Sequence, residues 1–189
     1  MRVLVACEES GVVRRAFRGR GHDAWSCDLL PARDGDPHHL QGDIFDSIRC
    51  DGPWELIIQH PPCQHIAVSG NRWHAGTWQR RQATEWTIDL WNAAVDHSRS
   101  GGRVCLENPV GLKIPGVKPQ WIQPWQFGHP TTKKTGLWLH NLPPLEPTDI
   151  VQPTEHRVWK MSPGPDRARD RATTYLGIAD AMATQWGKL

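Results

Sequence analysis

A cysteine that follows two prolines is the residue of this sequence best suited to nucleophilic chemistry. Cys63 comes directly after Pro61 and Pro62, and the apolar run 55–59 ends just before them. Two prolines stiffen the backbone and remove two amide donors, so the cysteine is held on a rigid segment. A thiol held in this way can act as a nucleophile when its thiolate is stabilised. The alternative is a small buried side chain without reactivity, the commonest fate of an unpaired cysteine.

A glutamate ends a second apolar run, 103–107, and Asn108 and Pro109 follow it. If the two runs are neighbouring strands, Glu107 lies close to Cys63. We expect desolvation there to raise the pKa of Glu107, so that its carboxyl group can donate a proton. The alternative is a carboxylate in water at the end of a strand.

The elements that must position these residues are short apolar runs that alternate with helical or loop segments. We expect strands at Arg2–Ala6, His22–Asp28, Glu55–Gln59, Arg103–Glu107 and Thr135–His140, and helices at Val12–Arg18, from Thr77 to about Ser98, and at Gly177–Trp186. This alternation predicts an α/β protein with a parallel sheet and helices on its faces. Ligands of such sheets bind beyond the carboxyl ends of the strands, which is where the polar segments of this sequence lie.

A glycine turn and two acids follow the first strands. Glu9, Ser10 and Gly11 come after the first strand, Asp28 ends the second, and Asp43 lies further on. A glycine turn that enters a helix, with an acid about 20 residues later, suits a nucleoside whose ribose hydroxyls bind the carboxylate. No complete G-x-G-x-x-G is present, so the alternative is an acid that only solvates a strand end.

Composition sets the wider limits. The 189 residues (21.4 kDa) fit one domain, and a formal net charge of +2 does not by itself indicate a polyanion binder. Five cysteines, odd in number and widely spread, favour thiols in a reducing cytosol over disulfides. We expect no membrane span, because no apolar run approaches about 18 residues. His60, Cys63 and His65 lie close together, but no second spaced pair completes a zinc site, so we expect no metal.

Taken in their order along the chain, the polar segments that follow the predicted strands resemble the motifs of the cytosine carbon-5 DNA methyltransferases. The resemblance is greatest to the very short phage and prophage proteins that look like trimmed members of that family. Pro62-Cys63-Gln64 matches the catalytic Pro-Cys-Gln, and Glu107-Asn108 matches the Glu-Asn pair. The match covers most of the chain. It implies a Rossmann-like S-adenosylmethionine-dependent methyltransferase fold, mostly parallel, with helices on both faces.

The resemblance implies one catalytic domain over residues 1–189, with an irregular, proline- and charge-rich segment at about 141–171 in place of a target-recognition domain. Low or short sequence specificity follows from that replacement. The Gln-x-Arg-x-Arg strand of the family is absent, and Lys133 and Lys134 stand at the comparable place.

The resemblance also implies roles for single residues, with DNA as the substrate and the cytoplasm (of a bacterial host, if the protein is phage-encoded) as the location. Cys63 attacks carbon 6 of cytosine, Glu107 protonates or hydrogen-bonds ring nitrogen 3, and carbon 5 takes the methyl group. The expected catalytic residues are Cys63, Glu107, Asn108 and Lys134. The expected S-adenosylmethionine-binding residues are Glu9, Ser10, Gly11, Asp28, Asp43, Pro61 and Pro62. The expected nucleic-acid-binding residues are Gln64, Ser69, Arg72, Trp73, Arg80, Arg81 and Lys133.

Arginines and tryptophans gather just after Cys63. We interpret 69–81 as a mobile lid that grips phosphate, and Arg167, Arg169 and Arg171 as a second basic cluster; the alternative for both is a solvated surface. Of the 11 tryptophans, we expect Trp86, Trp91, Trp138 and Trp186 to be structural. The candidates for base stacking, each with core packing as the alternative, are Trp73, Trp78, Trp121 and Trp125.

Two other functions remain open at this point. One is the same cysteine chemistry on a pyrimidine nucleotide or single-stranded nucleic acid, suggested by the missing recognition domain. The other is a non-catalytic relic that binds cofactor or DNA, suggested by the missing arginine motif. The donor could also be a modified S-adenosylmethionine that transfers another group.

Overall fold

A seven-stranded sheet forms the centre of the protein. The structure is a computed structural model that describes residues 1–98, 101–155, 164 and 167–189. The strands are β1 (Arg2–Ala6), β2 (Asp23–Asp28), β3 (His39–Gln41), β4 (Leu56–Gln59), β5 (Arg103–Pro109), β6 (Gln120–Ile122) and β7 (Thr135–His140). Their order across the sheet is β3-β2-β1-β4-β5-β7-β6.

The first five strands in that order run parallel, and β7 is antiparallel to both of its neighbours. The strand order changes direction between β1 and β4, and an antiparallel β7 lies between β5 and the edge strand β6. This is the arrangement of the Rossmann-like, S-adenosylmethionine-dependent methyltransferase fold. The fold class predicted from the sequence is therefore confirmed.

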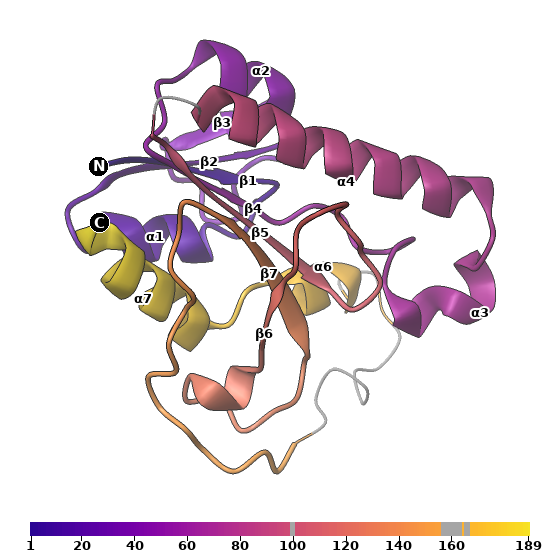
Figure 1. Ribbon diagram of the computed structural model, residues 1–189. Helices are drawn as coiled ribbons and strands as arrows, with labels where there is room; N and C mark the ends of the chain where they lie inside the picture. The colour runs from indigo at the N-terminus through magenta and orange to yellow at the C-terminus, as the bar shows by residue number, and fades with distance from the viewer. Residues whose placement is uncertain (99–100, 156–163, 165–166) are drawn as a thin grey trace.

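Helices cover both faces of the sheet, as expected (Figure 1). They are α1 (Val12–Arg18), α2 (Ile44–Cys50), α3 (Asn71–His74), α4 (Trp78–His97), α6 (Arg167–Ala172) and α7 (Leu176–Gln185), with 3-10 turns at Val68–Gly70, Pro124–Gln126 and Trp186–Lys188. The pair α1 and α7 lies on one face, and the pair α2 and α4 lies on the other. Among the described residues, no helix is both long enough and apolar enough to cross a bilayer.

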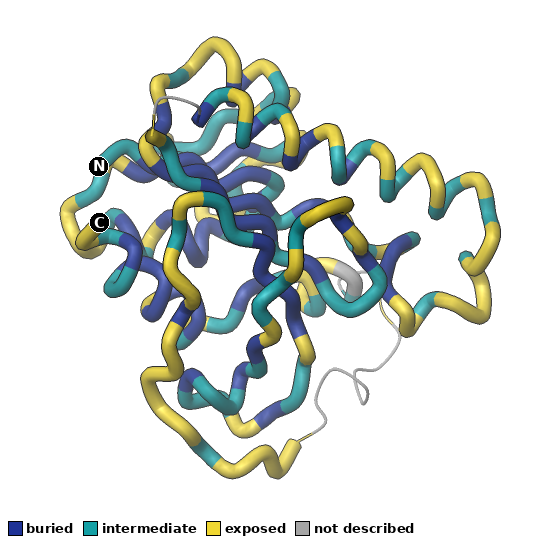
Figure 2. Tube along the Cα trace, viewed as in Figure 1, coloured by how far each residue is buried: buried dark blue, intermediate teal, exposed yellow. Residues whose placement is uncertain are grey.

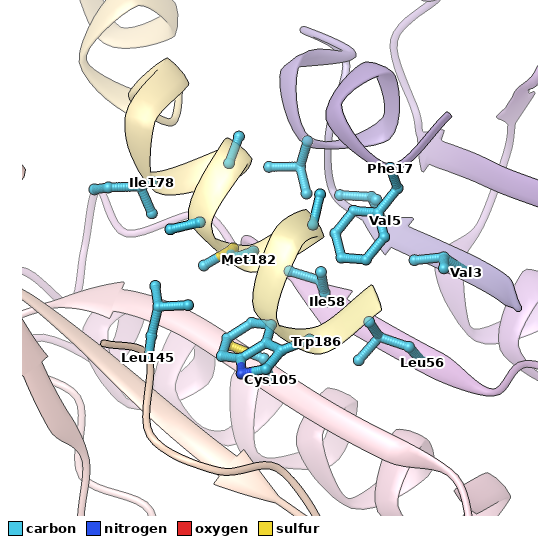
Figure 3. Packing of buried hydrophobic residues seen from close by; sticks show 14 of the residues in the cluster. Val3, Val5, Phe17, Leu56, Ile58, Cys105, Leu145, Ile178, Met182 and Trp186 are labelled. Atoms are coloured by element: carbon cyan, nitrogen blue, oxygen red, sulfur yellow. The ribbon is translucent and has the colours of Figure 1, made fainter. Parts of the chain in front are cut away.

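Alternating strand residues supply the two cores. Val3 and Val5 of β1 face α1 and α7, whereas Leu4 and Ala6 face α2 and α4, so this central strand is buried on both sides. Figure 3 shows Trp186 and Met182 packed over the sheet on the first face. Trp91, Trp138 and Trp186 are all buried, as predicted for structural tryptophans, and Trp86 is partly buried against the second core.

Several elements were not predicted from the sequence. They include β3 and α2; Asp43 accepts a hydrogen bond from the Phe45 amide (2.7 Å) and so caps α2. The predicted lid at 69–81 consists of a 3-10 turn, α3 and the first turn of α4, and Figure 2 shows most of it exposed.

The expected irregular segment at about 141–171 is only partly correct. Residues 141–155 contain no helix and no strand of the sheet. Residues 156–163 and 165–166 lie outside the described residues. The last part, from Arg167 onward, is helical (α6), so the irregular interpretation is wrong there.

Candidate active site

The carboxyl ends of β4 and β5 bring the cysteine and glutamate segments together. The two strands pair in parallel, with Gln59 opposite Leu106, so the residues that follow each strand emerge at the same edge. Asn108 Nδ2 donates a hydrogen bond to the Pro61 carbonyl (3.2 Å), which ties β5 to the segment that carries Cys63. Glu107 and Cys63 therefore belong to adjoining strand ends at one edge of the sheet, and the negative charge of Glu107 helps to raise the pKa of the Cys63 thiol.

The loop after Cys63 is folded tightly against the loop after β5. The Cys63 carbonyl accepts hydrogen bonds from the amides of Ile66 (3.0 Å) and Ala67 (2.9 Å). The Val68 amide then donates to the Val110 carbonyl (2.8 Å). Gly111 has a φ of 138°, and a Cβ added there would lie 2.2 Å from the Ile66 carbonyl oxygen, so the close approach of the two loops requires glycine.

We therefore expect Gly111→Ala to destabilise the protein by about 3 kcal/mol, because a steric overlap adds to backbone strain. Gly116 is the matched control, since its φ is also positive (76°) but a Cβ there would meet no atom within 4 Å. Gly116→Ala should cost only about 1–2 kcal/mol of strain. Urea denaturation of both variants measures the difference, and equal losses would contradict the proposed contact between the loops.

Glu107 is held by three partners. Its Oε2 lies 2.8 Å from His60 Nδ1 and accepts a hydrogen bond from Thr174 Oγ1 (3.3 Å), and the Lys133 charge acts on it as well. Burial favours the protonated carboxyl group, but the His60 hydrogen bond and the Lys133 charge outweigh it and lower the pKa of Glu107 to about 2. The expected raised pKa is therefore wrong, because it considered desolvation without these partners.

The low pKa of Glu107 makes folding stability depend on pH. Because the folded pKa of about 2 lies below the ordinary 4.5, ionised Glu107 stabilises the protein above about pH 5, and this contribution is lost as the pH falls toward 2. The pKa of Glu8, raised by burial, acts in the opposite direction. We expect Glu107→Gln to reduce the loss of stability between about pH 5 and pH 3, measured by urea denaturation. An unchanged difference between the two pH values would contradict the lowered pKa of Glu107.

The thiol of Cys63 is protonated at rest. Burial raises the pKa of Cys63, and the Glu107 charge adds to that effect, whereas the positive charges of Lys133 and Arg171 lower it. These two cations favour a thiolate here, as does a backbone hydrogen bond to the Cys63 sulfur. Cys63 therefore becomes a nucleophile only when its proton is removed during the reaction.

Of the two lysines before β7, Lys133 rather than Lys134 acts on the cysteine and the glutamate. Lys133 acts on both Cys63 and Glu107, and its Nζ donates to the Arg171 carbonyl (2.9 Å). Lys134 is exposed, and its Nζ lies 4.8 Å from the centre of the Trp121 ring. The structure therefore brings Lys133, predicted to contact nucleic acid, to the cysteine, and it places Lys134, predicted to be catalytic, over an aromatic ring.

The glycine turn after β1 is organised by two neighbouring glutamates. Glu8 is buried and caps α1, because its Oε1 accepts from the Val13 amide (2.6 Å) and its Oε2 from the Arg14 amide (3.2 Å). Glu9, the residue expected to bind cofactor, instead pairs with Arg33 (2.7 Å) and Arg169 (2.5 Å). The hydrogen bond from Arg169 is the largest of the effects that lower the pKa of Glu9 to about 2. Sequence reasoning missed the structural role of Glu8.

The rest of the expected cofactor set lies at the same edge of the sheet. Gly11 precedes α1 with a φ of 67°, and the Ser10 hydroxyl accepts a weak hydrogen bond from the Val12 amide (3.4 Å). Asp43 caps α2 through its side chain. Pro61 is buried, whereas Pro62 is exposed. These positions are compatible with a ligand beyond the ends of β1, β2 and β3.

The end of β2 combines a carboxylate with exposed apolar side chains. Asp28 Oδ1 accepts from the Leu30 amide (2.9 Å), and burial raises the pKa of the Asp28 carboxyl group. Leu29 and Leu30 are 74% and 50% exposed. A carboxylate for ribose hydroxyls beside apolar side chains for a base fits a nucleoside such as that of S-adenosylmethionine. A role for Leu29 and Leu30 was not predicted from the sequence. The pattern that could have indicated it is two apolar residues directly after an acid that ends a strand.

The region around α3 carries most of the residues expected to contact nucleic acid. The Arg72 guanidinium lies 5.2 Å from the centre of the Trp73 ring, and Trp73 and Trp78 are 71% and 61% exposed. Gln64, Ser69 and Arg81 are exposed as well. Core packing is therefore excluded for Trp73 and Trp78. We call the side chains of Arg72, Trp73, Trp78 and Arg81 the α3 surface.

Some of the other candidates have structural partners. Arg80 donates to Asn71 Oδ1 (2.5 Å) and to the Ile66 carbonyl (2.8 Å), so it ties α4 to the Cys63 loop. Arg169 of the second basic cluster binds Glu9. Trp121 is 40% exposed and meets Trp138 edge to face. Trp125 is half-buried. In the part of the chain that the structure describes, no three His, Cys, Asp or Glu side chains are grouped to hold a metal ion.

Comparisons with known proteins add a structural likeness. No protein-family profile matches the sequence, and no curated protein matches it significantly. Among solved structures, the chain is similar to the Dnmt2 methyltransferase of S. pombe, with a TM-score of 0.45 and 14% sequence identity. The likeness covers 76% of this chain and 50% of that protein, so the present chain spans about half the length of that methyltransferase. The fold assignment rests on the order and direction of the strands.

Proposed function

We propose that the protein is a DNA cytosine carbon-5 methyltransferase that uses S-adenosylmethionine and a covalent Cys63 adduct. The observation that carries the proposal is the grouping of Cys63 and Glu107 at the adjoining ends of β4 and β5, joined by the Asn108 hydrogen bond. The order of the Pro-Cys-Gln and Glu-Asn segments along the chain supports it.

The proposed reaction addresses the poor nucleophilicity of carbon 5 of cytosine. Attack of the Cys63 thiolate on carbon 6, with a proton or hydrogen bond from Glu107 at ring nitrogen 3, makes carbon 5 electron-rich. Lys133 favours both the thiolate and the negative charge that develops beside it. Asn108 holds the Pro61 carbonyl and so fixes the direction from which Cys63 approaches. A base then takes the proton from carbon 5, the electrons of that C–H bond re-form the double bond between carbons 5 and 6, and Cys63 leaves as thiolate.

S-adenosylmethionine, when bound, supplies the electrophilic methyl group that carbon 5 takes up. The residues suited to hold it are Asp28 for the ribose and Leu29 and Leu30 for the base, while Gly11 allows the positive φ (67°) of the turn before α1. Asp43, which follows β3, is a further candidate to contact the cofactor at this edge of the sheet. Glu9 contributes indirectly, because its ion pair with Arg169 joins α6 to the glycine turn.

We place these functions in one domain spanning residues 1–189, in which the segment at about 141–171 takes the place of a separate recognition domain. Selectivity for the bases around the target cytosine is then limited to what the α3 surface and the loops near Cys63 provide. A flipped cytosine costs a few kcal/mol of unstacking in duplex DNA and less in a single strand.

The second candidate is action on single-stranded nucleic acid or a pyrimidine nucleotide. Exposed Trp73 and Trp78, with Arg72 stacked on the former, favour it, because such side chains stack on unpaired bases. The test is to incubate the protein with S-adenosylmethionine and duplex DNA, single-stranded DNA or deoxycytidine triphosphate, and to analyse the nucleosides by mass spectrometry. 5-Methyldeoxycytidine from DNA supports the proposal, and the most active substrate separates the two candidates. Cofactor binding without product on any substrate indicates a relic.

The α3 surface makes a separate prediction about DNA affinity. Replacing Trp73 and Trp78 together with alanine should weaken binding of single-stranded DNA by about 10-fold or more, because each stacked base contributes about 1–3 kcal/mol. Replacing Arg72 and Arg81 with glutamine should weaken binding and reduce its dependence on salt concentration. Arg49→Gln, an exposed arginine on α2, is the matched control for loss of charge. Fluorescence anisotropy measures all three, and unchanged affinity in the tryptophan and arginine variants would remove this surface from the DNA-binding site.

A further inference from the structure

His60 lies directly before the Pro61–Cys63 segment, and its orientation is fixed by the sheet. Its amide donates to the Ala6 carbonyl (2.9 Å), which continues the pairing of β4 with β1 beyond Gln59. Its side chain turns toward β5, where Nδ1 lies 2.8 Å from Glu107 Oε2. Both side chains are only 10% exposed. A hydrogen bond this short between two nearly buried groups excludes a chance surface contact.

The second nitrogen of the imidazole is unusual. Nε2 of His60 is buried and has no hydrogen-bond partner among the described residues. The titratable and charged groups that act on this part of the site come from five elements: Glu107 on β5, Glu8 after β1, Lys133 before β7, Arg171 on α6 and Cys63 on the loop after β4. The imidazole therefore contacts Glu107 through Nδ1, while Nε2 makes no hydrogen bond with the described residues.

Glu107 alone is a poor proton donor. Its pKa of about 2 means that the carboxyl group carries no proton near neutral pH. The proposed mechanism nevertheless needs a proton or a strong hydrogen bond at ring nitrogen 3 when Cys63 attacks. Histidine is the side chain that ordinarily gains and loses a proton between pH 5 and 8.

We propose that His60 acts through Glu107, holding its carboxyl group and supplying the proton that Glu107 delivers to the cytosine ring. This inference rests on the proposed function. The step starts from the imidazolium form of His60, which carries a proton on each ring nitrogen. Its Nδ1–H bond breaks as an O–H bond forms on Glu107, which leaves a neutral imidazole protonated at Nε2. That O–H bond then breaks as ring nitrogen 3 takes the proton. At the same time the electron pair of the Cys63 thiolate, whose own proton has passed to water, forms the bond to carbon 6. The proton returns along the same path when Cys63 leaves with its electron pair, so His60 is regenerated.

His60→Asn separates the proton supply from the hydrogen bond. The asparagine Nδ2 can take the place of His60 Nδ1 and still donate to Glu107, but an amide does not exchange protons near neutral pH. We expect kcat to fall about 100-fold, with the KM for DNA and for S-adenosylmethionine nearly unchanged. We also expect the decline of kcat on the alkaline side of the wild-type pH profile to disappear. Combining His60→Asn with Glu107→Gln should cost little more than Glu107→Gln alone, because His60 acts only through Glu107.

A spectroscopic measurement on the wild-type protein tests the pair without any turnover. The ¹⁵N shifts of His60 should show a protonated, hydrogen-bonded Nδ1, and this signal should move in Glu107→Gln and stay in place in Cys63→Ser. An unprotonated Nδ1, or the same shifts in Glu107→Gln, would overturn the inference even if His60→Asn failed to fold.

The outcomes also separate this inference from the proposed function. Wild-type kcat and an unchanged pH profile in His60→Asn overturn the role of His60 and leave the methyltransferase proposal intact. A wild-type protein that modifies no cytosine substrate overturns the proposed function, and with it the role of His60 in that reaction.

Discussion

Cys63→Ser should abolish methyl transfer, lowering kcat by about 10⁴-fold or more, while S-adenosylmethionine still binds. Serine has nearly the same size and can keep the local hydrogen bonds, but its hydroxyl group is far less acidic than a thiol and forms a poorer nucleophile. The cations that favour a thiolate at this position, Lys133 and Arg171, do not make up that difference. Transfer of labelled methyl groups to DNA measures activity, and calorimetry measures cofactor binding.

Cys50→Ser is the matched control, because Cys50 is an exposed free thiol at the end of α2. It should retain full activity. Comparable loss in both variants would show that general loss of thiols, rather than the position of Cys63, is responsible. Full activity in Cys63→Ser would contradict the covalent mechanism.

Glu107→Gln should lower kcat by about 10²- to 10⁴-fold, the range typical of a lost general acid. Glutamine keeps the shape of the side chain and can still accept a hydrogen bond from Thr174 or His60, so the substitution removes the charge and the proton transfer with little change in packing. Because the interaction is needed only as negative charge develops on the ring, we expect kcat to fall much more than KM rises.

Glu85→Gln provides the control for this substitution, since Glu85 is exposed on α4. Single-turnover measurements of methyl transfer separate the chemical step from product release in both variants. A Glu107→Gln protein with wild-type single-turnover rates would exclude Glu107 from proton transfer.

The fold could be predicted in outline because its strands are buried on both faces. Arg2–Ala6 and Leu56–Gln59 are apolar along nearly their whole length, and that pattern places them at the centre of a parallel sheet. The closeness of Cys63 and Glu107 followed from the same rule, since neighbouring parallel strands end at one edge. The short elements β3 and β6 have three residues each, too few for a periodic pattern to be recognised.

The electrostatics of the site could not be predicted in the same way. The pKa of Glu107 depends on His60, Thr174 and Lys133, which are distant in sequence and meet the carboxylate only in the folded chain. The exchanged positions of Lys133 and Lys134 depend on which side of an extended segment faces Cys63, and a one-residue shift reverses that choice. Glu8 and Glu9 differ for the same reason, because one side chain turns into the core and its neighbour turns outward.

Covalent trapping of Cys63 tests the central claim most directly. DNA that contains 5-fluorodeoxycytidine can be attacked at carbon 6 and methylated at carbon 5, but carbon 5 then carries fluorine and has no proton to lose, so Cys63 cannot leave. Incubated with S-adenosylmethionine, the wild-type protein should form a complex with this DNA that survives denaturation, and peptide mass spectrometry should locate the adduct on Cys63. Cys63→Ser should form none. Methylation of ordinary DNA without such a complex, or an adduct on another residue, would contradict the account.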